Sequence, residues 1–466
     1  MSRAVRPNAH RPLSLAIGRP DSLKWTLSNR YRPTDGLHLR RLHEPLQDWK
    51  AVVSGSLVAD LGIGPEVWLF VTLLMCVTLF FKFGRFWSIR NLDLLLIFAL
   101  APGMMLLIGT GGSGSWWAYL WLFIGSMLWM IRCLVDLGLT RRPLLEPNLN
   151  ASGLACLTVG IVGLFIVEMI SLPIDEGVKR NPADASTTQP LEQPPGESIV
   201  DDVLRKTPLA LTVHRNEKPR VILKRVLALL AQIALVGGLI TVGWRHFERP
   251  IAGLSIATCY LLLPYSRFAL VDNGQLIPSA LIIVAVVFYL RPMIAGILIG
   301  LAGGWMPACL GLLPLWAGFY RKRGFWKFAV AGVGMAAICG LVGFGIPSLA
   351  VWSRALGARS LTESGLWPGV EAPVDHSFWS GIDPSYRLPV QIAYLIFVLI
   401  TTILPPNKNL GELIALSAAL LAAGQFWYLE AGGTLVLLYL PLVILMMFRP
   451  NLAIKQAFPK PTKLSS

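Results

Sequence analysis

The chain has 466 residues, of which 54% are hydrophobic and 14% are charged, and its formal net charge is +15. A soluble domain carries roughly 25% charged residues, so this composition excludes a soluble globular protein. The basic residues flank apolar segments and are not interleaved with aromatic residues in a recognition motif. We therefore expect membrane lipids, and not nucleic acid, as partners of this charge.

Apolar runs of membrane-spanning length recur along the chain, and the mean hydropathy is +0.60. The sequence thus predicts an all-α, polytopic integral membrane protein with about thirteen (11–13) transmembrane helices. The first 50 residues contain no apolar core, so we expect no cleavable signal peptide. The expected location is the plasma (inner) membrane.

The first half of the chain alternates between polar and apolar blocks. Residues 1–65 form a basic tail that ends in a stretch suited to an interfacial helix. Residues 66–172 are expected to hold four transmembrane helices, the third near 116–131. The polar segment 173–221 is rich in Pro, Ser, Thr and Gln in its middle, which is typical of disordered or extended chain.

The second half begins with a central membrane region, 222–347, with one helix expected near 277–290. A long extramembrane loop, 348–388, contains both aromatic and acidic residues. Three C-terminal transmembrane helices are expected within 389–449, and a basic tail covers 450–466. No internal repeat is evident in the sequence.

Residues 292–320 carry no charge. As one helix they would be about 43 Å long, which exceeds the roughly 30 Å of a hydrocarbon core. Gly303, Gly304 and Pro307 lie in the middle of this stretch, and these residue types favour a break in a helix. The sequence therefore predicts a hairpin of two short membrane helices.

Such a hairpin would place Arg291 and the cluster Arg321–Arg323 on one side of the membrane and Trp305 at its tip on the other. Basic residues in short loops favour the cytoplasmic side, which would put the arginines inside and Trp305 outside. The basic segment Arg215–Arg225 would then lie outside, which argues against this orientation.

The order of features from 264 to 327 resembles a known family. A polar loop, VDNGQ, precedes an apolar helix, and Arg-Pro, AGILIGLAGG, a Pro-containing helix and the basic cluster RKR follow. This order is similar to the central part of the GT-C superfamily of membrane glycosyltransferases, closest to the mannosyltransferase-like family GT87. The family often has a lysine at the hairpin tip, where this chain has Trp305.

The resemblance implies an enzyme that transfers a hexose from a polyprenyl-phosphate donor to a lipid or glycan acceptor at the non-cytoplasmic face. Such a transfer needs a carboxylate that takes the acceptor's proton. It also needs positive charge, or a bound divalent cation, to stabilise the departing phosphate. No other cofactor is expected.

The GT-C families carry their acid in the first outer loop, and the corresponding loop of this chain, 110–115, contains no acid. Asp60 and Glu66 precede the first predicted span and would take the place of that loop if the family's first helix is missing or replaced. Asp60 is therefore one candidate catalytic residue. The alternative is that Asp60 and Glu66 are only solvated acids near a helix start, where negative charge is mildly favourable.

Asp272 is the second candidate catalytic residue, because the resemblance converges on its loop. Asn273 and Gln275 beside it would bind substrate, and Arg267 would meet a phosphate. The alternative is that Asp-Asn-Gly simply forms a turn that caps a helix.

Trp305 and Glu430 complete the predicted substrate-binding set. Aromatic faces stack on sugar rings, although Trp at a membrane face also forms the ordinary interfacial belt. Glu430 lies in a short loop between the last two predicted spans, and a carboxylate at that depth is costly unless it is paired or wetted. Glu168 and Asp93 fall inside predicted spans, where an arginine partner or snorkelling would explain them.

No metal site or disulfide is expected. The six cysteines lie within predicted membrane helices without CxxC spacing, and no two histidines stand at ligand spacing. Two alternatives to the enzyme stay open, a transporter or flippase and a non-catalytic GT-C-like membrane assembly protein. The missing acid and Trp305 favour the second of these. The sugar, the acceptor and the oligomeric state do not follow from the sequence.

Overall fold

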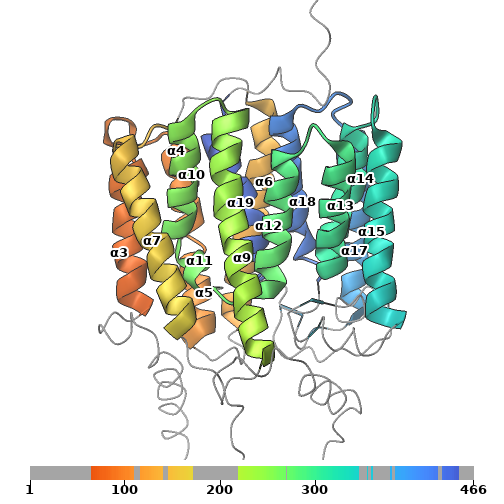
Figure 1. The fold of residues 1–466 in the computed structure, drawn as a ribbon, viewed down its shortest axis with the longest axis horizontal. Helices are drawn as coiled ribbons and strands as arrows, with labels where there is room; N and C mark the ends of the chain where they lie inside the picture. Colours follow the sequence, from red (N-terminus) through yellow and green to blue (C-terminus); the bar gives the residue numbers. More distant parts are fainter. Residues whose placement is uncertain are drawn as a thin grey trace, which may run out of the picture. The chain divides into compact units, whose positions relative to one another are not determined.

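A computed structural model describes residues 65–109, 116–139, 145–171, 219–268, 270–345, 384–428 and 433–450, together with Arg354, Ala358, Arg359, Phe378, Trp379 and Ile382. The regular structure of these residues is helical and they form no β-strand, so the expected all-α class is confirmed for this part of the chain. The helices run roughly parallel or antiparallel to one another (Figure 1).

The main helices follow one another in chain order. They are α3 (Pro65–Phe80), α4 (Ile89–Phe98), α5 (Ala101–Gly109), α6 (Trp116–Gly138), α7 (Ala151–Ser171), α9 (Pro219–Thr241), η5 (Val242–His246), α10 (Pro250–Leu262), α11 (Pro264–Phe268), α12 (Asn273–Val287), α13 (Pro292–Trp305), η6 (Pro307–Gly311), α14 (Leu312–Phe319), α15 (Phe325–Gly345), α17 (Arg387–Ile403), α18 (Leu410–Gly424) and α19 (Val436–Phe448).

Five of the described stretches are long and apolar enough to cross a membrane, which indicates a membrane protein. They are Ile89–Leu107, Trp116–Gly138, Ala151–Ser171, Val221–His246 and Phe325–Val342. Eight further apolar helices are shorter, with 10–17 residues each.

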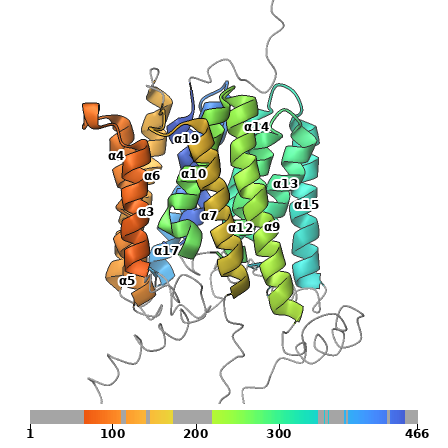
Figure 2. The same ribbon diagram turned by 60° about the vertical axis from the view of Figure 1, so that its left-hand side comes forward.

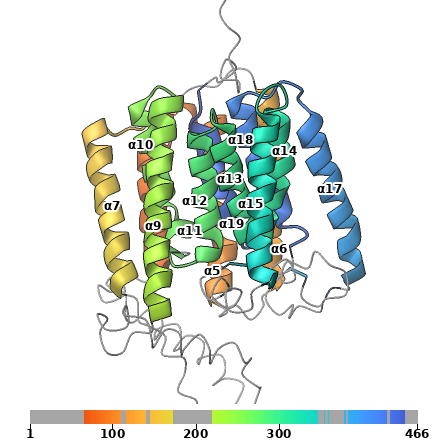
Figure 3. The ribbon, with the colours of Figure 1, turned by 45° about the vertical axis from the view of Figure 1, so that its right-hand side comes forward.

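The helices differ in how much of their apolar surface is covered. Every residue of α19, and every residue of α18 except Glu412, is buried. In contrast, α15 and α17 expose large apolar side chains such as Val330, Leu341, Leu395 and Leu399. Figure 2 shows α15, and Figure 3 shows α17, at the right-hand edge of the set of helices. Apolar surface on an outer helix suits contact with hydrocarbon chains.

Helix α6 continues to Gly138, although the sequence predicted its end near 131, and a buried charge network explains the difference. Arg132 donates to both carboxylate oxygens of Asp93 in α4, at 2.6 and 2.7 Å, and to Asp136 at 3.1 Å. Arg449, just after α19, donates to the other oxygen of Asp136. Paired charges can lie within an apolar bundle, so the helix does not need to end before them.

The hairpin region reverses direction after Trp305. The Trp305 indole donates to the carbonyl of Asn273 at the start of α12, while the Tyr320 hydroxyl donates to the carbonyl of Tyr289 just beyond its end. Helix α13 therefore runs antiparallel to α12, and η6 with α14 runs back. We call the end with Arg291 and Arg321 the basic end, and the other the Trp305 end.

Helices α13 and α15 are packed so closely that glycine is required between them. A Cβ added at Gly300 would lie 2.2 Å from the Gly332 carbonyl oxygen, and one at Gly296 would lie 2.6 Å from the Phe328 carbonyl oxygen. Small residues that let two backbones approach are a general device of membrane helix packing. The glycines of AGILIGLAGG thus fix α13 against α15.

Gly300→Ala tests this contact. Alanine gains up to about 1 kcal/mol of helix propensity, but overpacking against a backbone carbonyl costs about 1–3 kcal/mol. We expect a lower thermal unfolding midpoint for Gly300→Ala. The matched control is Gly334→Ala in α15, where an added Cβ meets nothing within 4 Å and stability should hold or rise. Equal midpoints for the two variants would contradict the close packing.

Cysteine labelling tests the direction of the hairpin. In a variant with the six native cysteines replaced, we expect Arg291→Cys and Lys322→Cys to react with an impermeant thiol reagent from the same side of the membrane. Tyr386→Cys, at the start of α17, should react from the other side. All three native side chains are exposed. Reaction of positions 291 and 322 from opposite sides would rule out the hairpin.

Candidate functional site

The start of α12 carries the acid to which the sequence pointed. Asp272 is the N-cap of this helix: Oδ1 accepts from the Gly274 amide at 3.0 Å, and Oδ2 accepts from the Gln275 side chain at 2.9 Å. The helix begins at Asn273, earlier than the predicted 277, because this cap satisfies its first amides. A carboxylate can accept about four hydrogen bonds, so Asp272 retains acceptor capacity.

Two amide side chains beside Asp272 each have a buried oxygen that accepts no hydrogen bond from the described residues. Asn273, which is fully buried, donates its Nδ2 to the Lys224 carbonyl at 2.9 Å, and Gln275, 7% exposed, donates its Nε2 to Asp272. These donations fix which way each amide points, because only nitrogen can donate to those oxygens. Asn273 Oδ1 and Gln275 Oε1 have no hydrogen-bond partner among the described residues.

Two further groups converge on the same turn. The indole of Trp305, at the tip of the hairpin, donates to the Asn273 carbonyl at 3.0 Å. The backbone amide of Arg359 donates to the Trp305 carbonyl at 2.9 Å. The guanidinium of Arg359 lies beside Gly274. If Gly274 carried a Cβ, that atom would be 3.3 Å from Nε and Nη2 of Arg359 and 3.0 Å from Oδ1 of Asp272.

The backbone adds another acceptor to this group. Pro278 lies inside α12 and has no N–H, so the carbonyl of Gly274 lacks its usual helical donor four residues on. We call Asp272, Asn273, Gln275, Trp305 and Arg359 the polar cluster. It presents several oxygen acceptors and one cation in a partly buried setting, and an unmade hydrogen bond is costly at its buried members, Asn273 and Gln275. Such a site suits a ligand that brings several O–H or N–H donors.

Arg267 does not belong to the polar cluster. Its guanidinium forms a buried ion pair with Glu168 in α7, at 2.8 Å, and lies 4.7 Å from the ring centroid of Trp68. The predicted phosphate contact for Arg267 therefore competes with an internal carboxylate. Glu168 has the arginine partner that its position inside a helix called for.

Several of the predicted site residues are not among those that the structure describes. Asp60, Glu430 and most of the loop 348–388 lie outside the described residues, and the side chain of Glu66 does too. Among the described residues, no group of three or more His, Cys, Asp or Glu could hold a metal ion. All six cysteines are free thiols.

Sequence reasoning missed two features of this structure. Arg359 lies in a loop with no periodicity, so nothing in the sequence pairs it with a turn nearly ninety residues earlier. An arginine partner was one of the explanations expected for Asp93, but its identity was missed for the same reason, because Arg132 stands 39 residues away in the chain. The only available signal was the presence of arginines in apolar segments, which by itself names no partner.

Comparisons with protein-family models, with curated proteins and with solved structures gave no match for this chain.

The role of Arg267 can be tested by a pair of variants. Arg267→Gln leaves the Glu168 carboxylate buried without its partner, which typically costs about 3–5 kcal/mol. Adding Glu168→Gln removes the uncompensated charge, so we expect the double variant to regain much of the lost stability. Thermal unfolding of the purified protein measures both. A double variant no more stable than Arg267→Gln would contradict a mainly structural pair.

Proposed function

We propose that this chain is a membrane glycosyltransferase of the GT-C kind, which transfers a hexose from a polyprenyl-phosphate donor to a lipid or glycan acceptor. The observation that carries the proposal is the pair of buried, unpartnered amide oxygens, Asn273 Oδ1 and Gln275 Oε1, next to the Asp272 carboxylate. A sugar hydroxyl is a donor that would complete such acceptors, and a sugar carries several of them.

In the proposed reaction the acceptor hydroxyl oxygen attacks the anomeric carbon of the donor sugar. A new carbon–oxygen bond forms, the bond between the anomeric carbon and the phosphate oxygen breaks, and the phosphate leaves with the electron pair. Asp272 takes the hydroxyl proton as general base. Arg359, whose guanidinium adjoins Gly274, stabilises the negative charge of the phosphate. It takes the part first expected of Arg267.

A hydroxyl-bearing ligand is favoured over a divalent cation at this site. Carboxylate and amide oxygens could ligate a hard cation such as Mg²⁺. However, the Arg359 guanidinium approaches the same turn, and like charge at that distance opposes a second cation. We therefore assign the polar cluster to the sugar and keep the metal as an alternative for the test below.

The membrane arrangement is part of the proposal. The five long helices and the eight shorter apolar ones would give about thirteen crossings if all of them span the bilayer. The basic end would face the cytoplasm and the polar cluster the other side, in the plasma membrane. A polyprenyl-phosphate donor would then reach the cluster from the outer leaflet.

Asp272→Asn tests the chemistry directly. An amide oxygen can still accept from the Gly274 amide, so the cap survives and stability should change by less than about 1 kcal/mol. Loss of a proton acceptor slows a reaction by about 10²–10⁴-fold. Purified protein is incubated with a panel of polyprenyl-phosphate hexoses and lipid acceptors, with and without a chelator, and products are identified by mass spectrometry.

The matched control removes a helix cap at the basic end. Asn409 caps α18 through a capping box with Glu412, so Asn409→Ala costs about 1 kcal/mol without touching the polar cluster. It should retain full transfer. Full transfer by Asp272→Asn would remove Asp272 from the catalytic role, and loss of transfer on chelation would favour a metal.

The second candidate is a non-catalytic GT-C-like membrane assembly protein, and one observation favours it. Both oxygens of Asp272 already serve the helix, one as a cap and one as the acceptor for Gln275. A carboxylate kept for folding alone would look the same. Absence of transfer by the unmodified protein across the whole donor panel would support this candidate over the enzyme.

A further inference from the structure

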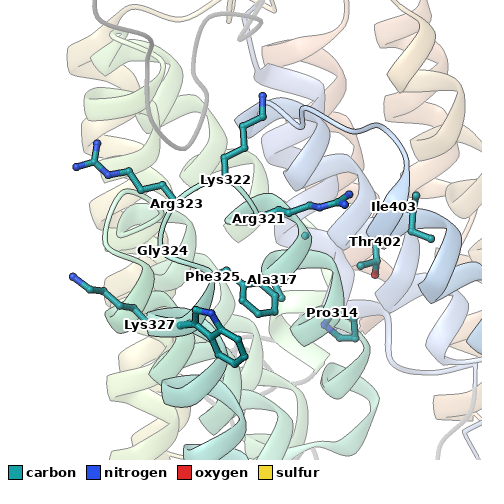
Figure 4. Close-up of a pocket in the computed structure, with 12 residues that line it drawn as sticks. Pro314, Ala317, Arg321, Lys322, Arg323, Gly324, Phe325, Lys327, Thr402 and Ile403 are labelled. Carbon is teal, nitrogen blue, oxygen red and sulfur yellow. The ribbon is translucent and has the colours of Figure 1, made fainter.

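The basic end of the hairpin, opposite to the end with the polar cluster, contains a pocket. This pocket of about 890 Å³ lies between the end of α14, the turn that follows it, the start of α15 and the end of α17. Its lining includes Arg321, Lys322, Arg323 and Lys327. In Figure 4 the Arg321 side chain extends towards Thr402 and Ile403 of α17, while Arg323 and Lys327 point to the opposite side. We call this the basic pocket.

Two cations of the basic pocket, Arg321 and Lys322, have no acid close to them in the chain. The sequence contains no Asp or Glu from 273 to 362, which includes α14, the turn and α15, and none from 384 to 411, which includes α17. Among the described residues neither Arg321 nor Lys322 forms an ion pair.

Lys408, just beyond α17, adds to this charge. Its ammonium donates to the carbonyls of Thr402 and Pro405, at 2.8 and 3.0 Å. Burial lowers the pKa of Lys408, and the positive charge of Arg321 lowers it further, while Glu412 raises it. The positive charges of Arg321 and Lys408 therefore act on each other, while Glu412 offsets part of the charge at Lys408.

The rest of the pocket wall is apolar. Pro314, Ala317, Phe325, Trp326 and Ile403 line it, and it lies between helices whose outer faces are apolar and exposed. A small inorganic anion needs no such wall. An amphipathic anion does, because its charged group can meet the arginines while its hydrocarbon lies along the helices.

The turn before α15 has a backbone conformation that favours glycine. Gly324 has φ +92, a conformation that side chains rarely adopt, and it stands directly before α15. The first amide groups of a helix have no partner within it and favour negative charge. Phe325 and Lys327 belong to this first turn of α15, and both residues line the pocket.

We propose that the basic pocket binds the phosphate group of an anionic membrane phospholipid, whose acyl chains lie along α14, α15 and α17. Arg321 and Lys322 bind the phosphate, and Ile403 with Phe325 covers the first part of the chains. The site lies at the opposite end of α13 and α14 from Asp272, so it is distinct from the site of sugar transfer. It holds whether or not the chain is an enzyme.

Lipid binding to the full chain in neutral detergent tests the proposal. Native mass spectrometry counts bound phosphatidylglycerol against phosphatidylcholine over a concentration series. Arg321→Gln with Lys322→Gln removes two cations from the pocket. At about 1 kcal/mol for each juxtamembrane cation, phosphatidylglycerol binding should weaken about thirtyfold.

The matched control removes two exposed cations at the same end but outside the pocket, Arg245→Gln with Arg291→Gln. It should leave phosphatidylglycerol binding within about twofold, where an effect of general surface charge would weaken both double variants equally. Equal loss in the two would overturn the proposal.

Ile403→Trp keeps every charge but fills the pocket. Ile403 is 51% exposed at the end of α17, so the larger ring does not enter the core. We expect this variant to lose selective phosphatidylglycerol binding, and retained binding would overturn the pocket as the site. A further experiment adds inorganic phosphate as a competitor of the lipid. Phosphate should not displace the lipid, and displacement at equal concentration would show that a free anion, not a lipid, is bound.

Discussion

Charge in an apolar surrounding must be paired, and this constraint decides which acids of the chain are available for chemistry. Asp93 and Asp136 are tied to Arg132, and Glu168 is tied to Arg267. These contacts join α4 to α6 and α7 to α11, so they hold helices together that are distant in sequence. Every buried acid that the structure describes has an arginine partner.

Asp272 differs from these acids because its partners are amides and not arginines. An amide partner does not compensate the charge of a carboxylate as a buried arginine does, and each oxygen of Asp272, although hydrogen-bonded once, can accept a further bond. The same turn holds Asn273 in place through α9 and through Trp305. The groups that would bind a ligand are thus also those that join α9, α12 and the hairpin, so a conservative change such as Asp to Asn is needed to separate the two roles.

The sequence predicted the all-α class and the position of most helices, because apolar runs and their lengths are local properties. It did not predict where α6 ends or what Arg267 contacts, because both depend on partners far away in the chain, 99 residues in the case of Glu168. The Asp-Asn-Gly turn was foreseen as a cap and as a site, and the cap is present. The stacking of Trp305 on a sugar stays a prediction, and its indole N–H donates to the Asn273 carbonyl.

Helix length places the polar cluster below the membrane surface, if the basic end lies at one interface. Helix α13 has 14 residues and is therefore about 21 Å long, against a hydrocarbon core of about 30 Å. The cluster at its tip would then be recessed by roughly 10 Å from the far interface. Water is scarce at that depth, so the buried oxygens of Asn273 and Gln275 cannot rely on solvent. A substrate whose reacting group is attached to a lipid can reach such a recess from within the bilayer, and a soluble sugar nucleotide cannot do so as directly.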